Sequence, residues 1–140
     1  MKLSRTVGYA LQATLQLAEA DGTTSGRPIP CSRLAAEGGM PERFLLQILR
    51  NLVTRGILRS TRGVDGGYVL CQSLEETSLL DLMEAIDGPF SPRIPAHAGL
   101  SSEARVKLEC ALSGVTKKLR EELGKIKLAH LSNGHARKRD

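Results

Sequence analysis

The chain has 140 residues, enough for one hydrophobic core and too few for two full-sized domains. It contains no tryptophan, two tyrosines and two phenylalanines, so a core must be built mainly from aliphatic side chains, a composition that favours helices. No apolar run is long enough to span a membrane, and the net charge of +5 points to a polyanionic partner.

The cysteines of this chain are few, widely spaced and odd in number: Cys31, Cys71 and Cys110. No signal peptide accompanies them, so the sequence predicts a reduced, cytoplasmic setting. In that setting each cysteine is expected to be a small packing residue.

The first third of the chain predicts two helices separated by a loop. Apolar residues recur at helical spacing over 3–18, with Ser4 as the expected N-cap. The stretch 22–30 holds glycines, polar residues and two prolines, which indicates a loop. A second, short helix is predicted with Ser32 as its N-cap and Gly38-Gly39 as its end.

A third helix is predicted from Pro41 to about Gly56, with opposite apolar and polar sides. Its apolar side is formed by Phe44, Leu45, Ile48, Leu49, Leu52 and Val53. Its polar side carries Arg43, Gln47, Arg50, Asn51 and Thr54. A short helix, a glycine turn and a longer helix with a basic side are typical of a helix-turn-helix, whose second helix enters the DNA major groove. The alternative is a helix with an ordinary solvated face.

A β-hairpin is predicted next, with strands over 57–61 and 68–71 around a glycine-rich turn at 62–67. Such a ribbon directly after the recognition helix is typical of a wing that approaches a phosphate backbone or the minor groove. From 41 to 63 five arginines oppose one glutamate, a local charge of +4. The alternative is a plain surface hairpin, and Tyr68 is expected to pack beneath it.

The last part of the chain predicts an acidic helix, a linker and a long helix. Residues 74–87 carry five acidic side chains and no basic one, and Ser78 caps the helix, whose carboxylates are expected to form a solvated face. Prolines at 89, 92 and 95 deny regular structure to the segment that follows. A long helix capped by Ser101 or Ser102 carries one apolar stripe, interrupted near Gly124.

Several of these segments together resemble the Rrf type of bacterial winged-helix repressors, the IscR/NsrR/CymR-like family. The resemblance covers nearly the whole chain to about Leu131. It rests on Leu3, Tyr9-Ala10-Leu11, Leu34-Ala35, Phe44-Leu45, Gln47-Ile48-Leu49, Gly56-Ile57-Leu58, Arg62-Gly63, Gly66-Gly67-Tyr68 and the run from Leu80 to Gly88.

The resemblance implies that Arg43, Phe44 and Gln47 face the major groove and that Arg62 reaches the minor groove. An arginine fork and an amide one turn apart suit base edges, where a good bidentate contact discriminates by about 1–3 kcal/mol. Other arginines, Arg55 among them, suit phosphates. The predicted DNA-binding set is Arg43, Phe44, Gln47, Arg50, Arg59, Arg62, Gly63, Gly66 and Gly67. The chain departs from its relatives at Leu46, where they often carry a polar or acidic residue, and at 6–8, where they carry a basic cluster.

Cluster-binding relatives carry three cysteines between the acidic helix and the long helix, and this chain has none of them. The stretch 90–99 contains no thiol, and Lys107 occupies the place of the last cysteine. No metal and no cofactor are therefore predicted. The alternative is a redox or metal trigger built from Cys110 and His97 across a dimer.

The predicted fold is mainly α: a winged helix-turn-helix domain with a two-stranded β wing, plus a long C-terminal dimerisation helix. The expected parts are the DNA-binding domain at 1–88, a proline-rich linker or effector loop at 89–100, the dimerisation helix at 101–131 and a basic tail at 132–140. The predicted dimer interface consists of Leu108, Leu112, Val115, Leu119 and Leu123. A helix that folds back onto its own core is the alternative.

The predicted function is a sequence-specific regulator, a repressor, that binds double-stranded DNA as a homodimer. Pairing places two recognition helices about 34 Å apart, on successive major grooves of a roughly palindromic operator. No catalytic triad, phosphate-binding Gly-Lys loop or apolar carboxylate pair is present, so no enzyme is predicted. The rival is a winged-helix adaptor that binds proteins instead of DNA, and an unknown effector or protein partner is left open.

Overall fold

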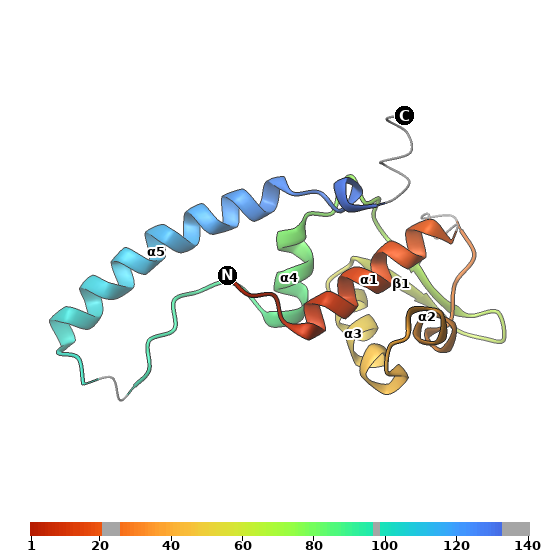
Figure 1. The fold of residues 1–140 in the computed structure, drawn as a ribbon, viewed down its shortest axis with the longest axis horizontal. Helices are drawn as coiled ribbons and strands as arrows, with labels where there is room; N and C mark the ends of the chain where they lie inside the picture. The colour runs from red at the N-terminus through yellow and green to blue at the C-terminus, as the bar shows by residue number, and fades with distance from the viewer. Residues whose placement is uncertain (21–25, 97–98, 133–140) are drawn as a thin grey trace.

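The computed structural model describes residues 1–20, 26–96 and 99–132, and within them the fold is mainly helical. Five α-helices, one two-stranded antiparallel sheet and one 3-10 helix are described there (Figure 1). The elements are α1 (Arg5–Glu19), α2 (Cys31–Gly38), α3 (Glu42–Thr54), β1 (Leu58–Thr61), β2 (Gly67–Leu70), α4 (Leu79–Asp87), α5 (Ser102–Lys125) and η1 (Leu128–Leu131). The predicted fold class is confirmed.

The core lies where α1, α3 and α4 pack against one another. Leu17 of α1, Leu49 of α3 and Leu82 of α4 are fully buried there. Burial of one such side chain stabilises the fold by about 1.5–3 kcal/mol, so this aliphatic core holds the three helices without large aromatic residues. This packing fixes the orientation of α3 and therefore of the side chains that α3 exposes to solvent.

The turn between α2 and α3 depends on a left-handed residue. Gly39 has a φ of 65° and ends α2, and the amide of Met40 donates to the carbonyl of Ala35 at 2.9 Å. Glycine adopts this conformation without the penalty that a Cβ brings. The predicted end of α2 at Gly38-Gly39 is therefore confirmed, and α3 starts immediately after Pro41.

Three of the predicted serine caps are confirmed and one is wrong. The hydroxyls of Ser4, Ser78 and Ser101 accept hydrogen bonds from the amides of their helices' first turns. Ser32 instead lies inside α2, which begins at Cys31 after an extended Pro30 that offers no side-chain cap. A proline ahead of a helix supplies the extended backbone of a cap position, so no capping serine is needed for the chain to turn there.

The hairpin is paired along four positions and is anchored to the loop before α2. Arg59 lies opposite Val69 and Ser60 opposite Tyr68 in the register. On the other edge of β2, Tyr68 exchanges two backbone hydrogen bonds with Ile29, at 2.9 and 3.0 Å. This bridge ties β2, near the turn end of the hairpin, to the loop before α2, and it was not predicted.

The four helices α1 to α4 and the hairpin form what we call the winged body. The end of α5 returns to this body, whereas its first half projects away from it (Figure 1). The amide of Leu79 donates to the carbonyl of Ile126 at 2.8 Å, and that of Leu128 donates to the carbonyl of Thr77 at 2.9 Å. Leu128 is fully buried. The C-terminal turn of the described chain is thus part of the winged body. None of the described helices has the length and apolar character that crossing a bilayer requires.

Candidate nucleic-acid interface

One side of α3 is buried and the other is open to solvent, as its periodicity predicts. Leu45, Ile48, Leu49 and Leu52 are buried, and they hold the helix against α1 and α4. The solvent side presents four residues of the predicted DNA-binding set, all exposed: Arg43, Phe44, Gln47 and Arg50. The core therefore orients a basic helix side outward, at the position that a recognition helix occupies.

Phe44 was predicted to lie on the apolar side of α3, but its side chain is not buried there. Its side chain is 54% exposed, although the neighbouring Leu45 is completely buried. The ring packs edge-to-face against Tyr9 of α1, with centroids 6.5 Å apart and an interplanar angle of 76°. Phe44 thus lies at the border of the core, where it is supported by α1 and still open to an incoming molecule.

A hollow lies beside Phe44, between the start of α1 and the open side of α3. Its lining consists of Thr6, Pro41, Arg43, Phe44, Gln47, Ile48 and Asn51. The amide nitrogen of Gln47 donates to the side-chain oxygen of Asn51, one turn later, at 3.4 Å. Two hydrogen-bonding amides and one guanidinium therefore surround a hollow that also has apolar walls.

The wing presents Arg59 on β1 and Arg62 at the start of the turn, both exposed. The turn is narrow because the amide of Gly66 donates to the carbonyl of Gly63 at 3.0 Å. A Cβ on Gly66 would overlap the backbone oxygen of Thr61. A Cβ on Gly67 would overlap the carbonyl group of Ile29 and lie 2.7 Å from the nitrogen of Pro30. These two glycines shape and anchor the wing through steric requirements.

Tyr68 of β2 is within electrostatic reach of Cys31 of α2 and Arg50 of α3. Tyr68 is half-buried against the core, as predicted. Burial raises the pKa of its phenol, the charge of Cys31 raises it further, and the charge of Arg50 lowers it. The guanidinium of Arg50 on α3 is therefore within electrostatic reach of the Tyr68 phenol on β2.

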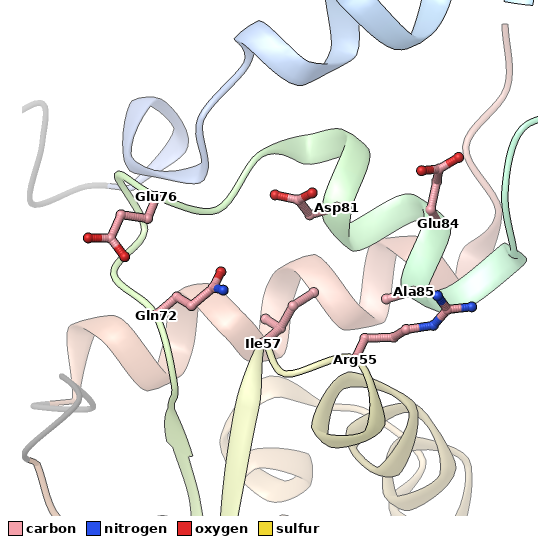
Figure 2. Close-up of a pocket in the computed structure, with 7 residues that line it drawn as sticks. All are labelled: Arg55, Ile57, Gln72, Glu76, Asp81, Glu84 and Ala85. Atoms are coloured by element: carbon pink, nitrogen blue, oxygen red, sulfur yellow. The ribbon is translucent and has the colours of Figure 1, made fainter.

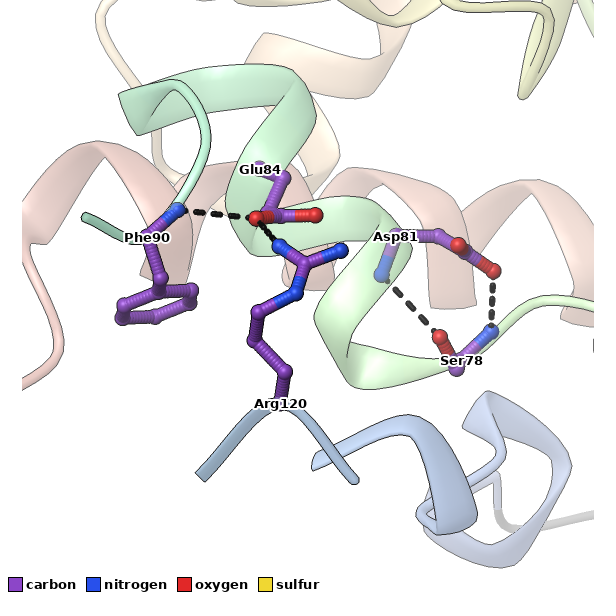
Figure 3. A network of polar contacts seen from close by, with 5 residues as sticks. All are labelled: Ser78, Asp81, Glu84, Phe90 and Arg120. Carbon is purple, nitrogen blue, oxygen red and sulfur yellow. Dashed lines mark hydrogen bonds and ion pairs between the residues drawn. The ribbon is translucent and has the colours of Figure 1, made fainter. Parts of the chain in front are cut away.

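The acidic residues over 74–87 are exposed as predicted, apart from the half-buried Glu84, but Asp81 and Glu84 also make contacts that were not predicted. The carboxylate of Asp81 accepts from the amide of Ser78, in a reciprocal capping box (Figure 3). Glu84 accepts from the amide of Phe90 at 2.8 Å and forms an ion pair with Arg120 of α5 (Figure 3). These carboxylates begin α4, hold the linker and tie α5 to the body.

A polar pocket separates the end of α3 from α4 on this side of the molecule (Figure 2). Arg55 extends from the end of α3 toward the part of α4 that carries Glu84, and Gln72 and Glu76 lie on the segment after β2 (Figure 2). Arg55 therefore lines the same pocket as Glu76, Asp81 and Glu84.

The predicted interface residues of α5 do not share one environment. Val115 is 62% exposed and Leu108 is 38% exposed. Leu112 and Leu119 are half-buried, and Leu119 packs against the core of its own chain. Leu123 is only 3% exposed, so in a single chain it already belongs to the core. The open part of the predicted interface therefore consists mainly of Val115 and Leu108.

The cysteines lie on three separate parts of the fold. Cys31 is buried in α2, where its thiol contacts the carbonyl of Glu42 at 3.6 Å and burial raises its pKa. Cys71 and Cys110 are exposed, so the prediction of a packing role is wrong for Cys71 and is not met by Cys110 in a single chain. Within 1–20, 26–96 and 99–132, no three His, Cys, Asp or Glu side chains gather into a metal site. His97 lies outside the described residues.

Solved structures share this fold over nearly its whole length. The chain aligns with CymR of B. subtilis, described as a global cysteine regulator, at a TM-score of 0.69 and 24% identity, covering 94% of this chain and 96% of that one. It aligns with the oxidized form of Staphylococcus aureus CymR at a TM-score of 0.66 and 26% identity, covering 95% and 97%. The likeness extends from the wing to α5.

Curated relatives match over a little less than two thirds of this chain. A putative HTH-type transcriptional regulator of Mycobacterium tuberculosis is 42% identical over 91 residues, which are 65% of this chain and 55% of that protein. The rrf2-like putative regulator of Rhodobacter capsulatus is 36% identical over 90 residues, 64% of this chain and 60% of that protein. The match therefore spans less than two thirds of the length of these relatives.

A family model extends the match to almost the entire chain. The Rrf2 model, described as an iron-dependent transcriptional regulator, matches residues 3–134. The matching family and relatives are transcriptional regulators and not enzymes, which agrees with the sequence-based prediction. The chain belongs to the Rrf2 family of transcriptional regulators.

Proposed function

We propose that this regulator binds duplex DNA as a homodimer and represses transcription from a roughly palindromic operator. One observation carries the proposal: the buried side of α3 directs Arg43, Gln47 and Arg50 into solvent. The wing follows α3 directly and adds Arg59 and Arg62. Arginine forks suit guanine edges and phosphates, and an α-helix fits the major groove.

The roles of the individual residues follow from chemistry and position. Arg43 and Gln47, one turn apart on the open side of α3, suit base edges. Arg50 and Arg59 suit phosphates on either side of the groove. Arg62, at the narrow tip of the ribbon, suits the minor groove. Gly66 keeps the turn tight, Gly63 supplies a positive φ within it, and Gly67 lets β2 lie against Ile29, so together they shape a tip that can approach the backbone of DNA.

Dimerisation through α5 supplies the second half of the proposed recognition. Val115 and Leu108 leave apolar surface open on α5, and a second copy of α5 would cover it. Two-fold pairing would then present two recognition helices to two half-sites. The repressor role rests on the resemblance to Rrf-type repressors, and a DNA ligand implies the cytoplasm as the location of the protein.

The iron named in the family description does not fit the residues of this chain. An iron–sulfur centre is held mainly by thiolates. The thiols here belong to α2, to the segment after β2 and to α5, and the first of them is buried with a raised pKa. The described part of the chain gathers no three metal-ligating side chains. The proposed function therefore assigns no iron-dependent step to this regulator.

The test is the salt dependence of duplex binding. A duplex selected from a random pool is labelled, and its affinity is measured between about 50 and 200 mM salt. Each phosphate contact contributes about −0.9 to the slope of log K against log salt, so several contacts give a steep slope. A protein that ignores duplex DNA at low salt would favour the adaptor.

Arg62→Ala is the variant that tests the wing. It is expected to lower the affinity and to reduce the salt slope by about 1, because one positive charge leaves the DNA-facing surface. Arg93→Ala serves as the control, since Arg93 is an exposed arginine in the linker, far along the chain from the basic residues of α3 and the wing. Equal affinities for Arg62→Ala and the parent protein would contradict the wing assignment.

A further inference from the structure

The hollow between α1 and α3 combines apolar walls with hydrogen-bonding and charged groups. Its walls include the ring of Phe44, the side chain of Ile48 and the ring of Pro41, with Thr6 of α1 on the far side. Polar groups surround these walls: the guanidinium of Arg43 and the amides of Gln47 and Asn51. A ligand for this hollow must therefore offer an apolar group with hydrogen-bonding atoms beside it.

Phe44 is positioned for contact with such a ligand. More than half of its side-chain surface is open, at 54% exposure, so folding alone does not account for a large apolar ring at this position. Its edge-to-face contact with Tyr9, at 6.5 Å between centroids, limits the freedom of the ring. A ring already held in place loses little conformational entropy when a ligand packs against it.

The amides beside the hollow are also held in place before any ligand arrives. The side-chain nitrogen of Gln47 donates to the side-chain oxygen of Asn51 at 3.4 Å. This contact leaves the oxygen of Gln47 and the nitrogen of Asn51 for other partners. Amide side chains make paired hydrogen bonds to the N6 and N7 atoms of adenine in the major groove.

If α3 enters the major groove as proposed above, the chemistry of the groove identifies the apolar group that the hollow would receive. Among the base edges exposed in the major groove, the 5-methyl of thymine is the apolar group, and it lies on the same base pair as the N6 and N7 atoms of adenine. We propose that the hollow of Phe44, Thr6 and Ile48 receives the 5-methyl group of a thymine at one fixed position of each operator half-site. This inference rests on the proposed function and adds a base identity to it.

The side chains beside the hollow suggest contacts for the adenine that pairs with this thymine and for the adjacent base pair. An amide of Gln47 or Asn51 lies at the border of the hollow, where it can contact the adenine that pairs with this thymine. Arg43 lies on the other side of Phe44 along α3, where a guanine of an adjacent pair suits its fork. The half-site would contain an A·T pair next to a G·C pair.

The test replaces thymine with uracil, which lacks only the 5-methyl group. Duplexes selected from a random pool are synthesised with uracil at each thymine of the half-site in turn, and binding is measured by fluorescence anisotropy. Uracil at one position is expected to weaken binding about fourfold for each half-site, which corresponds to removing one buried methyl group. Cytosine and 5-methylcytosine at that position form a second pair with the same difference of one methyl group.

Two variants connect the effect to the hollow. Phe44→Ala is expected to bind the thymine and uracil duplexes equally, because the wall that contacts the methyl group is gone. The side chain is largely exposed, so the variant should keep its fold, which circular dichroism checks. Arg43→Ala is the matched control: it should bind both duplexes more weakly but keep the fourfold ratio between them.

The outcomes separate this inference from the proposed function. Sequence-specific binding with no sensitivity to uracil at any thymine would overturn the thymine assignment and leave the DNA-binding proposal standing. An unchanged fourfold ratio in Phe44→Ala would also overturn it. A protein that binds no duplex at all at low salt would overturn both proposals together.

Discussion

Helices α3 and α5 both carry apolar residues at helical spacing, but those of α3 are buried and several of those of α5 are exposed. In α3 the apolar side is enclosed by α1 and α4, and Leu45 and Leu49 have no exposed surface. Near the middle of α5, Val115 keeps 62% of its surface open. A period of three to four residues predicts that a helix has an apolar partner. The comparison shows that this period alone does not predict whether the apolar partner belongs to the same chain.

The end of α5 shows where the change of environment occurs. Leu123 is buried against the winged body, and Leu119 packs partly against it. Val115, about one turn earlier than Leu119, is 62% exposed. The last turns of α5 therefore complete the core of its own chain, whereas its earlier turns carry the exposed apolar residues that we propose pair with a second copy.

The largest effect is expected in the enclosed helix. Leu49→Ala should lower the free energy of unfolding by about 2–5 kcal/mol, because it leaves a cavity among fully buried side chains. Chemical denaturation followed by circular dichroism measures the loss. Val64→Ala at the fully exposed wing tip is the control, and it should change stability by less than about 0.5 kcal/mol. A loss below about 1 kcal/mol for Leu49→Ala would contradict the enclosed core.

The second effect is expected in the open helix and concerns association. Val115→Asp should weaken the dimer by about 3 kcal/mol or more, since it would place an unpaired charge in the interface. Analytical ultracentrifugation should then find monomers at concentrations where the parent protein is dimeric. Ser113→Asp is the control, because Ser113 lines the pocket that faces the linker. A dimer unaffected by Val115→Asp would place the interface elsewhere.

A smaller effect is expected where the wing meets the loop before α2. Gly67→Ala should destabilise the wing by about 1–3 kcal/mol, because its Cβ would overlap the carbonyl of Ile29 in a conformation that suits only glycine. Faster hydrogen exchange at the amide of Tyr68 would report the loss. Gly8→Ala is the control: its Cβ meets open space within α1, and it should stabilise the fold by about 0.5–1 kcal/mol.

The smallest effect is expected at the contact that joins α4 to α5. Glu84→Gln should cost about 1 kcal/mol or less, because Arg120 is partly exposed and solvent screens the pair. The amide of Phe90 would keep an acceptor in the new side chain. Thermal unfolding measures the difference, and high salt should reduce it. A loss of several kcal/mol would show that the ion pair, and not apolar packing, holds α5 to the body.

Local signals were sufficient for much of the fold. The caps at Ser4, Ser78 and Ser101 depend on side chains that contact amides three residues away, so the sequence alone predicts them. Helical periodicity likewise predicts that Arg43 and Gln47 lie opposite the buried side of α3. The short helix α2 was harder, because both Pro30 and Ser32 are compatible with its start.

Contacts between distant residues could not be predicted in this way. The bridge between Ile29 and Tyr68 joins a proline-rich loop to a strand, and no periodic pattern marks the loop as its partner. The packing of Phe44 on Tyr9 depends on how α1 crosses α3. The ion pair of Glu84 with Arg120 spans 36 residues and depends on the return of α5. Each is set by the assembled core and not by neighbouring residues.

The most direct test of the central claim is a titration of two duplexes. One carries both selected half-sites, and the other has one half-site scrambled. A paired set of basic recognition surfaces should bind the intact duplex more tightly by about a hundredfold or more, because the second contact is made within the same complex. Equal affinities for the two duplexes would contradict the account of a dimer that reads DNA twice.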